Sequence, residues 1–363
     1  MSADGKVPLP LTWGGAVNRR PALVLAALLA LSAAGCTPVS YGDTPSGMRV
    51  GIAYDQGGPL DGLVNQAVQA GLHDFSAAEG GVGAVHELVA VPNEPPDNRY
   101  DRLLILCQSG YDPVIAVGQG YVGAEPSAGP LARAARDCPG TRFAVVSDSG
   151  VSAPNVANLV FADAEGAYLM GAAAALSSTA HQVGFLANCH LPSVAALESG
   201  YRAGVEAQRS GTRVDVRYLS EDPRTCPDVT DDRVARGAAD DLYDGGADVV
   251  YQVVGPAGVG VFEAAKEHGG LAIGFGADQY KTADPAFRDA ILTSHVDRVD
   301  IAVADLLRGV AHGTSHAGNT TYDVGNGGIR YAASGPRVAA LAPVLDGYQK
   351  KIANGTIVVP GSP

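Results

Sequence analysis

Aromatic residues make up only 6% of this 363-residue chain, with a single tryptophan, and positive charge is scarce as well. The chain has 25 lysines and arginines against 38 aspartates and glutamates, which gives a formal net charge of −13. Nucleic-acid binding requires a basic face that attracts phosphates, so this balance argues against a nucleic-acid partner. No tandem repeat or low-complexity tract stands out, and 46% of the residues are apolar, which favours a folded protein with a large core.

The short motifs that mark common catalytic sites are also missing. The sequence contains no G-x-S-x-G, H-E-x-x-H, Walker or C-x-x-C motif. The eight histidines are scattered, and no cysteine has the spacing of a zinc ligand. We therefore predict a protein that is not an enzyme, with no catalytic residues, no cofactor and no metal site.

The first 35 residues have the features of an export signal. Arg19 and Arg20 precede an apolar run, 21–34, that is too short for an ordinary membrane-spanning helix. The run ends in LSAAGC, which resembles a bacterial lipobox and predicts cleavage before Cys36 and lipidation of its thiol. We predict a signal peptide at 1–35 and a tether at 36–47, which would hold the protein on the outer face of the cell membrane. An ordinary secretory signal is the alternative, and the general or twin-arginine export route stays open.

Four cysteines remain after Cys36, and an exported protein meets an oxidising compartment in which disulfides persist. Four cysteines allow three pairings. We favour Cys107–Cys138 and Cys189–Cys226, because each pair would lie within one half of the molecule. Four free buried thiols are the alternative.

Apolar strand-like runs alternate with stretches of helical spacing from residue 48 onward. This alternation predicts βαβ units and a mostly parallel sheet, and ten such strands are too many for one ordinary sheet. We therefore predict an α/β protein of two doubly wound lobes. The N-terminal lobe comprises 48–150 and about 280–312, and the C-terminal lobe comprises 151–279 and about 313–355. The strand-like runs are 48–54, 84–91, 113–118, 142–147, 156–161, 182–187, 213–219, 247–254, 271–275 and 290–295.

Polar residues follow several of these runs, where an open α/β sheet collects its ligand. Asp55, Asp148 and Asp278 stand at such strand ends, and GPAGVG, 255–260, opens a helix after a strand. Each of them alone is more often a helix cap or a turn residue, but as a set they favour a cleft between the lobes.

Four stretches match a known family in the same order. They are VGIAYDQGGPLDGLVNQAVQAGL (50–72), NVANLVFADAEGAYLMGAAAAL (155–176), GADVVYQVVGPAGVGVFEAAKE (246–267) and LTSHVDRVD (292–300). They resemble the basic membrane protein lipoproteins, the purine-nucleoside receptor A-like group of ABC transporter substrate-binding proteins. The resemblance implies a type I periplasmic-binding fold, with two Rossmann-like lobes, three crossover segments and a ligand in the central cleft.

The resemblance also implies a set of ligand-binding positions and exposes four departures. The implied positions are Asp55, Asn65, Asp148, Tyr251, Gly255, Gly258 and Asp278. The departures are Val64 for a stacking aromatic, Ser147 for a base-reading aspartate, Gly276 for a ribose-binding aspartate and Asp297 for a ribose-binding lysine. These changes predict a family scaffold with an altered ligand.

From the resemblance we expect a monomeric, lipid-anchored solute-binding protein that serves an ABC permease and takes a nucleoside-like polar ligand. A receptor lipoprotein that signals to a membrane partner is the alternative.

Overall fold

The computed structural model describes residues 47–55, 57–91, 94–123, 125–146, 150–220, 229 and 231–361. The predicted signal peptide, most of the predicted tether including Cys36, and also Ser147, Asp148 and Cys226 lie outside these residues. Among the described residues, no helix is long and apolar enough to cross a membrane.

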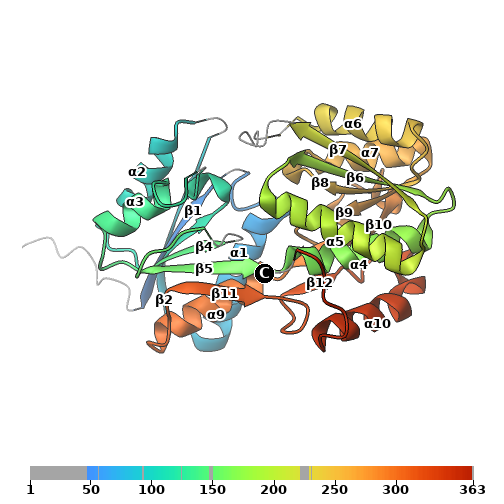
Figure 1. Ribbon diagram of the computed structural model, residues 1–363. Coiled ribbons are helices and arrows are strands. Elements are labelled where there is room, and N and C mark those ends of the chain that lie inside the picture. Colours follow the sequence, from blue (N-terminus) through green and yellow to red (C-terminus); the bar gives the residue numbers. More distant parts are fainter. Residues whose placement is uncertain are drawn as a thin grey trace, which may run out of the picture. The chain divides into compact units, whose positions relative to one another are not determined.

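The first of two six-stranded sheets has the strand order β11-β5-β4-β3-β1-β2, and all its pairings are parallel. Its strands are β1 (Met48–Tyr54), β2 (Val82–Val89), β3 (Val114–Val117), β4 (Phe143–Val146), β5 (Val156–Phe161) and β11 (Gly318–Tyr322). Its helices are α1 (Val64–Glu79), α2 (Pro96–Gln108), α3 (Pro130–Asp137) and α9 (Val299–Ala311). Figure 1 shows β11, in orange, beside β5, in green, although the two are far apart in the sequence.

The second sheet has the order β12-β10-β9-β8-β6-β7, and only β12 runs antiparallel to its neighbour. Its strands are β6 (Gln182–Cys189), β7 (Arg213–Ser220), β8 (Val249–Val253), β9 (Leu271–Gly274), β10 (Ile291–Asp297) and β12 (Ile329–Tyr331). Its helices are α4 (Asp163–Ser177), α5 (Pro192–Gln208), α6 (Asp232–Asp244), α7 (Gly258–His268), α8 (Gln279–Thr282) and α10 (Ala342–Ala353). The prediction of two α/β lobes with parallel sheets is confirmed.

Some strands lie in a different sheet from the one that the predicted lobe boundaries imply. β5 pairs with β4, so the chain leaves the first sheet after Phe161 and not near residue 150. β10 belongs to the second sheet, and the chain returns to the first lobe only at α9, which packs on α1. β11 then joins the first sheet before the last crossing to β12. Hydrophobic patterns identify strands, but only tertiary pairing decides which sheet each strand joins.

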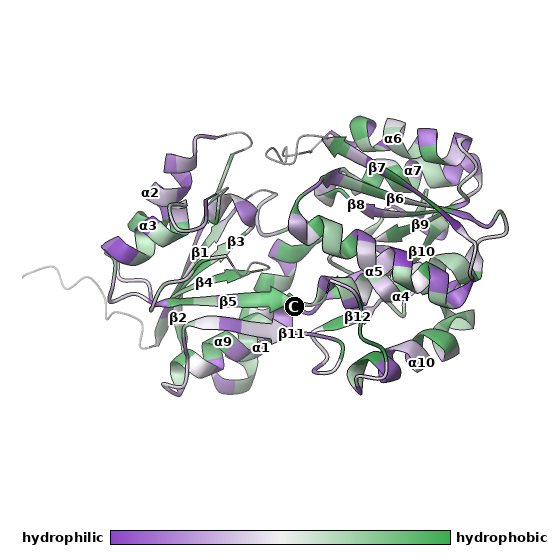
Figure 2. Ribbon diagram, in the orientation of Figure 1, coloured by the Kyte–Doolittle hydropathy of each residue, from purple (hydrophilic) through white to green (hydrophobic). Residues whose placement is uncertain are grey.

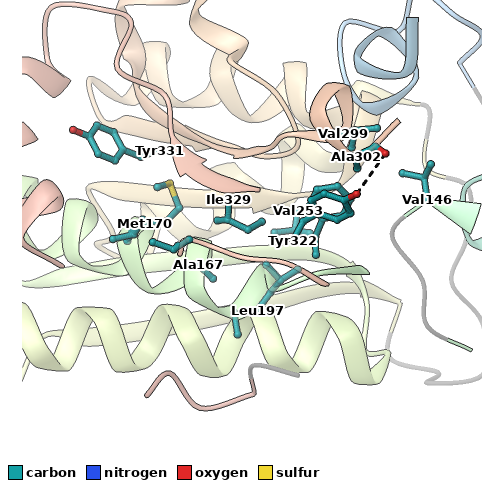
Figure 3. Packing of buried hydrophobic residues seen from close by; sticks show 14 of the residues in the cluster. Val146, Ala167, Met170, Leu197, Val253, Val299, Ala302, Tyr322, Ile329 and Tyr331 are labelled. Atoms are coloured by element: carbon teal, nitrogen blue, oxygen red, sulfur yellow. Dashed lines mark hydrogen bonds between the residues drawn. The ribbon is translucent and has the colours of Figure 1, made fainter. Parts of the chain in front are cut away.

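The strands are short and apolar because most of them are covered on both faces, as is usual in parallel sheets. All four residues of β3 and of β4 are buried. The surrounding helices carry both apolar and polar residues, which Figure 2 shows as mixed green and purple ribbons. Figure 3 shows part of the core near the crossings, where the Tyr322 hydroxyl donates a hydrogen bond to the carbonyl oxygen of Ala302, at 3.5 Å.

Helices α4 and α5 pack with their backbones in close contact, and three glycines permit this. A Cβ atom at Gly171 would lie 2.0 Å from the carbonyl oxygen of Tyr201. One at Gly200 would lie 2.2 Å from the carbonyl oxygen of Ala164, and one at Gly204 would lie 1.9 Å from that of Tyr168. Any larger residue at these positions would force the helices apart.

A disulfide joins Cys107 and Cys138, whose Cα atoms are 6.5 Å apart. Cys189 is also disulfide-bonded, and its partner lies outside the described residues. The first predicted pair is therefore present, and the pairing of Cys189 with Cys226 stays a prediction.

Candidate functional site

A cavity of about 310 Å³ opens where strands of both sheets end. Its wall includes the last residues of β3, β4, β8 and β10 together with residues that follow β1 and β9. Ligands of open α/β proteins collect at this edge, because strand-end loops and helix N-termini meet there. The polar residues in the wall are Asp55, Asn65, Gln119, Asp163, Asn188, Ser193 and Asp297, and most of the others are apolar or glycine.

A second cavity, of about 430 Å³, lies between α9 and the strands β5 and β11. It contains Asp305, Arg308 and His312 of the α9 region. It includes none of the strand-end residues identified from the sequence, so the smaller cavity is the candidate site.

Asp55 lies in the cavity wall directly after β1, but its carboxylate is engaged internally. It accepts hydrogen bonds from Arg99 Nε, at 2.6 Å, and from the backbone N–H of Gly120, at 2.8 Å. The Arg99 guanidinium also forms an ion pair with it, so the negative charge is balanced within the protein. Gly118 has a φ of +110°, and a Cβ there would lie 2.4 Å from the Asp55 Cβ, so the turn that holds Asp55 requires glycine.

Asn65 is buried in the first turn of α1 and lines the cavity. Its amide donates a hydrogen bond to the carbonyl oxygen of Gly58, at 3.0 Å. Asp61 stabilises the start of this helix by accepting hydrogen bonds from the backbone N–H groups of Leu63, at 2.8 Å, and Gln66, at 3.1 Å. The loop and the capped helix together fix the direction of the Asn65 side chain.

Val64 and Gly276, two of the predicted departures, face each other across the cavity wall. A Cβ at Gly276 would lie 3.6 Å from Val64 Cγ2, and Gly276 has a φ of +86°. The loop after β9 therefore uses a backbone conformation that favours glycine. The sequence alone did not predict this contact between the lobes.

Three predicted binding residues do not line the cavity. Tyr251 is fully buried, with its ring packed against Phe185 and Tyr201. Gly258 packs against the side chain of Gln252, which a Cβ would approach to 2.6 Å. Of the predicted glycine pair, only Gly255 is in the wall.

Asp278, the third of these residues, is held by second-lobe partners outside the cavity. It accepts a hydrogen bond from the Ser334 hydroxyl and forms an ion pair with Lys281 at 3.0 Å. Asp278 and Gly258 were indicated by their places after strands, whereas Tyr251 lies within β8 and was indicated by the family resemblance alone. Neither signal says which side chains face the cavity. Asp148 lies outside the described residues.

The structure reveals a cluster of Asp163, His295 and Asp297 at the cavity, in which His295 and Asp297 are buried and Asp163 is half-buried. One potential ligand atom from each residue lies within 4.8 Å of the others. His295 Nε2 is 3.1 Å from Asp297 Oδ1, and His295 Nδ1 is 2.9 Å from the Tyr251 hydroxyl. Asp163 is the first residue of α4, and Asp297 is the last residue of β10, so the cluster spans two of the crossings between lobes.

Burial shifts the pKa of two groups in this region, Asp163 and Tyr251. It raises the pKa of Asp163 well above its usual range, and the nearby charge of Asp297 raises it further. Burial likewise raises the pKa of the Tyr251 hydroxyl, which therefore stays protonated. Tyr251 thus acts beneath the cavity, as a hydrogen-bond partner of His295.

The imidazole of His295 fits against a glycine of α4. A Cβ at Gly166 would lie 2.2 Å from His295 Nε2. The Phe275 ring contacts the His295 imidazole at nearly a right angle, and the centroids of the two rings are 5.0 Å apart. Sequence reasoning missed Asp163 and His295, since Asp163 lies more than 130 positions before the other two cluster residues. The His-x-Asp pattern at the end of an apolar strand was the available signal.

The chain is similar to known proteins over most of its length. The model of the family described as "ABC transporter substrate-binding protein PnrA-like" matches residues 63–363. A Lactococcus lactis protein named "ABC transporter nucleoside-binding protein BmpA" is 27% identical over 363 residues, covering 93% of this chain and 97% of the relative. An uncharacterized lipoprotein of Pyrococcus horikoshii is 29% identical over 325 residues, covering 85% of this chain and 75% of the relative.

The fold also has solved counterparts. The crystal structure of an ABC transporter solute-binding protein from Aeropyrum pernix superposes with a TM-score of 0.68 at 21% identity, covering 86% of this chain and 94% of that one. This likeness confirms the type I periplasmic-binding fold predicted from the sequence.

Proposed function

The chain belongs to the family of PnrA-like ABC transporter substrate-binding proteins, and from this premise we propose that it is a lipid-anchored receptor for a nucleoside-related solute. The family consists of solute-binding proteins, not enzymes. In this proposal Cys36 carries the lipid, the protein faces the outside of the cell membrane, and an ABC permease receives the solute. Closure of the two lobes on the ligand would present the form that the permease recognises.

The observation that carries the proposal is a cavity whose wall comes from the strand ends of both lobes. Its volume of about 310 Å³ is at the lower end of the range for small-molecule sites, which suits a compact solute. Asn65 and Asn188 offer amide groups that can both donate and accept hydrogen bonds, as a heterocyclic base requires.

The same wall supports a ligand that differs from an ordinary nucleoside. Val64 offers no aromatic face, and loss of one base–aromatic stack costs about 1–3 kcal/mol. Gly276 provides no carboxylate and Asp297 no ammonium group for ribose hydroxyls. We therefore propose a solute of nucleoside size with a modified or absent ribose.

Calorimetric titration of the delipidated protein with a nucleoside panel tests the proposal, and mass spectrometry identifies any solute that co-purifies. We expect a co-purified polar solute that binds tightly, and guanosine or inosine that binds weaker than micromolar. Asn65→Ala should weaken binding of that solute at least tenfold, whereas Gln66→Ala, which truncates the neighbouring side chain, should leave it unchanged. Micromolar guanosine or inosine binding would contradict the altered ligand, and equal binding by both variants would contradict the site.

A further inference from the structure

The cluster of Asp163, His295 and Asp297 combines one imidazole nitrogen with two carboxylate groups. Their ligand atoms lie within 4.8 Å of one another. This is a donor set that divalent first-row metal ions accept, and three protein ligands leave coordination positions open. His295 and Asp297 form a local His-x-Asp pattern, but Asp163 is distant in the sequence, and the sequence analysis predicts no metal site.

The three facing atoms are buried and without hydrogen bonds. Within the described part of the chain, Asp163 Oδ1, His295 Nε2 and Asp297 Oδ1 have no hydrogen-bond partner. The His295 side chain is fully buried and that of Asp297 is 3% exposed. Buried polar atoms are rarely left unpaired, because removing them from water without a hydrogen bond destabilises the folded state. Three of them at one place indicate a missing ligand.

The separation between the donor atoms of His295 and Asp297 suits a shared metal ion. His295 Nε2 and Asp297 Oδ1 are 3.1 Å apart without forming a hydrogen bond. Two donors that each lie about 2.1 Å from one ion, at right angles, are about 3.0 Å apart. The Tyr251 hydroxyl, 2.9 Å from His295 Nδ1, holds the other ring nitrogen, as outer partners of metal-bound histidines do.

The charge around the cluster also favours a cation. The described cavity wall contains no lysine or arginine, and the charge of Asp55 is already balanced by Arg99. For the carboxylates of Asp163 and Asp297 the described wall supplies no lysine or arginine, and Asp297 Oδ1 lies 3.1 Å from the His295 imidazole. A divalent ion would neutralise both.

We propose that Asp163, His295 and Asp297 bind a divalent transition-metal ion, of the Zn²⁺ or Mn²⁺ type, at the cavity floor. Because Asp163 follows β5 and Asp297 ends β10, the ion joins two crossover segments. Its open positions face the cavity, where oxygen atoms of a bound solute can complete the coordination. The inference goes beyond the proposed function, since the ion binds whether or not the solute is nucleoside-related.

The test uses the full-length lipoprotein in detergent, free of any histidine tag, stripped with EDTA and dialysed. Titration with ZnCl₂ and with CoCl₂ alone should show one saturable site with micromolar or tighter affinity. Bound Co²⁺ should give a visible absorption band whose intensity is typical of a four- or five-coordinate ion. Asp297→Asn and His295→Gln should each weaken binding at least 100-fold.

Two further variants separate the site from surface binding and from misfolding. Asp240→Asn removes a carboxylate from a surface pair with His268, 3.1 Å away, and should leave the affinity unchanged. Tyr251→Phe keeps all three ligands and removes only the outer hydrogen bond, so it should weaken binding about 10–100-fold while the Co²⁺ band remains.

The inference would be overturned if no saturable metal binding were seen at metal concentrations below 1 mM. The carboxyl groups of Asp163 and Asp297 would then share a proton instead of a metal ion. Unchanged affinity in Asp297→Asn, or loss of affinity in Asp240→Asn, would overturn the inference as well. Solute binding in EDTA, measured by thermal shift, separates the two proposals. A protein that binds solute but no metal contradicts only the metal site, and one that binds metal but no solute contradicts only the proposed function.

Discussion

At the scale of single residues, Gly166 determines whether the cluster of Asp163, His295 and Asp297 can form. The imidazole of His295 occupies the space where a side chain at 166 would begin, 2.2 Å from Nε2. Since the ring is also held by Tyr251 and Phe275, it has little room to move.

We expect Gly166→Ala to lower the free energy of unfolding by about 1–3 kcal/mol, as overpacked cores do. Urea denaturation measures the effect. Gly237→Ala is the matched control, because this helical glycine of α6 is solvent-accessible and an added Cβ would have no atom within 4 Å. The control should gain about 0.5–1 kcal/mol from helix propensity. If both variants changed the free energy of unfolding equally, the His295 side chain would have moved to make room for the new methyl group.

Glu94 is a second residue with a measurable consequence. It accepts hydrogen bonds from the Arg102 guanidinium and from the backbone N–H of Val91, at 3.2 Å, and it lies 3.7 Å from Arg99. The hydrogen bonds from Arg102 are the largest cause that lowers the pKa of Glu94 below its usual value of 4.5.

A lowered carboxyl pKa stabilises the folded state above the unfolded pKa, and this stabilisation disappears as the pH falls through the folded value. The unfolding free energy of the wild type should therefore drop as the pH falls below about 4.5. In Glu94→Gln the stability should be lower at pH 6 and should fall less on acidification. Urea unfolding of both proteins at pH 6 and pH 3.5 measures how much unfolding free energy each loses on acidification. Equal losses would show that Glu94 does not contribute to this pH dependence.

At the scale of elements, the contact of α4 with α5 supports the cavity floor, because α4 begins at Asp163. The helices approach so closely that glycine is the only residue that fits at three contact points. The axes of two packed helices with ordinary side chains lie about 8–10 Å apart, and glycines at the contact allow a shorter distance.

We expect Gly204→Ala to destabilise the protein by about 1–3 kcal/mol or more, since the new methyl group would lie 1.9 Å from the Tyr168 carbonyl oxygen. It should also weaken solute binding by shifting α4. Gly347→Ala in α10, where nothing lies within 4 Å, should be neutral or stabilising. Thermal unfolding and solute titration of both variants check this, and a Gly204→Ala protein as stable as the wild type would contradict it.

The sequence predicted elements better than their assembly. Apolar runs located the strands from β1 to β10, because burial leaves a local mark in the sequence, but not β11 and β12. The sheet to which β5 and β10 belong left no such mark, since pairing is a contact between distant segments. Strand-end position indicated Asp55 and Gly255, and the family resemblance indicated Asn65; all three line the cavity, whereas Tyr251, Gly258 and Asp278 do not. Asp163 and His295 were not predicted.

At the scale of the whole molecule, the Cys107–Cys138 disulfide closes a loop with a sequence separation of 31. By loop entropy, such a bridge stabilises the folded state by about 3–4 kcal/mol. The double variant Cys107→Ala, Cys138→Ala should lose this much in urea unfolding without reductant, which leaves the disulfide of Cys189 intact. A loss below about 1 kcal/mol would show that the unfolded chain is already restricted there.

The position of β11 has a consequence for how the protein comes to fold. The first sheet contains the earliest strand of the described chain, yet its outer strand, Gly318–Tyr322, and the helix that covers α1 come from the last quarter of the sequence. Such distant contacts form slowly, because long loops must close first. The first sheet therefore cannot be completed until residues as late as Tyr322 are available, so the N-terminal lobe does not finish folding ahead of the C-terminal one.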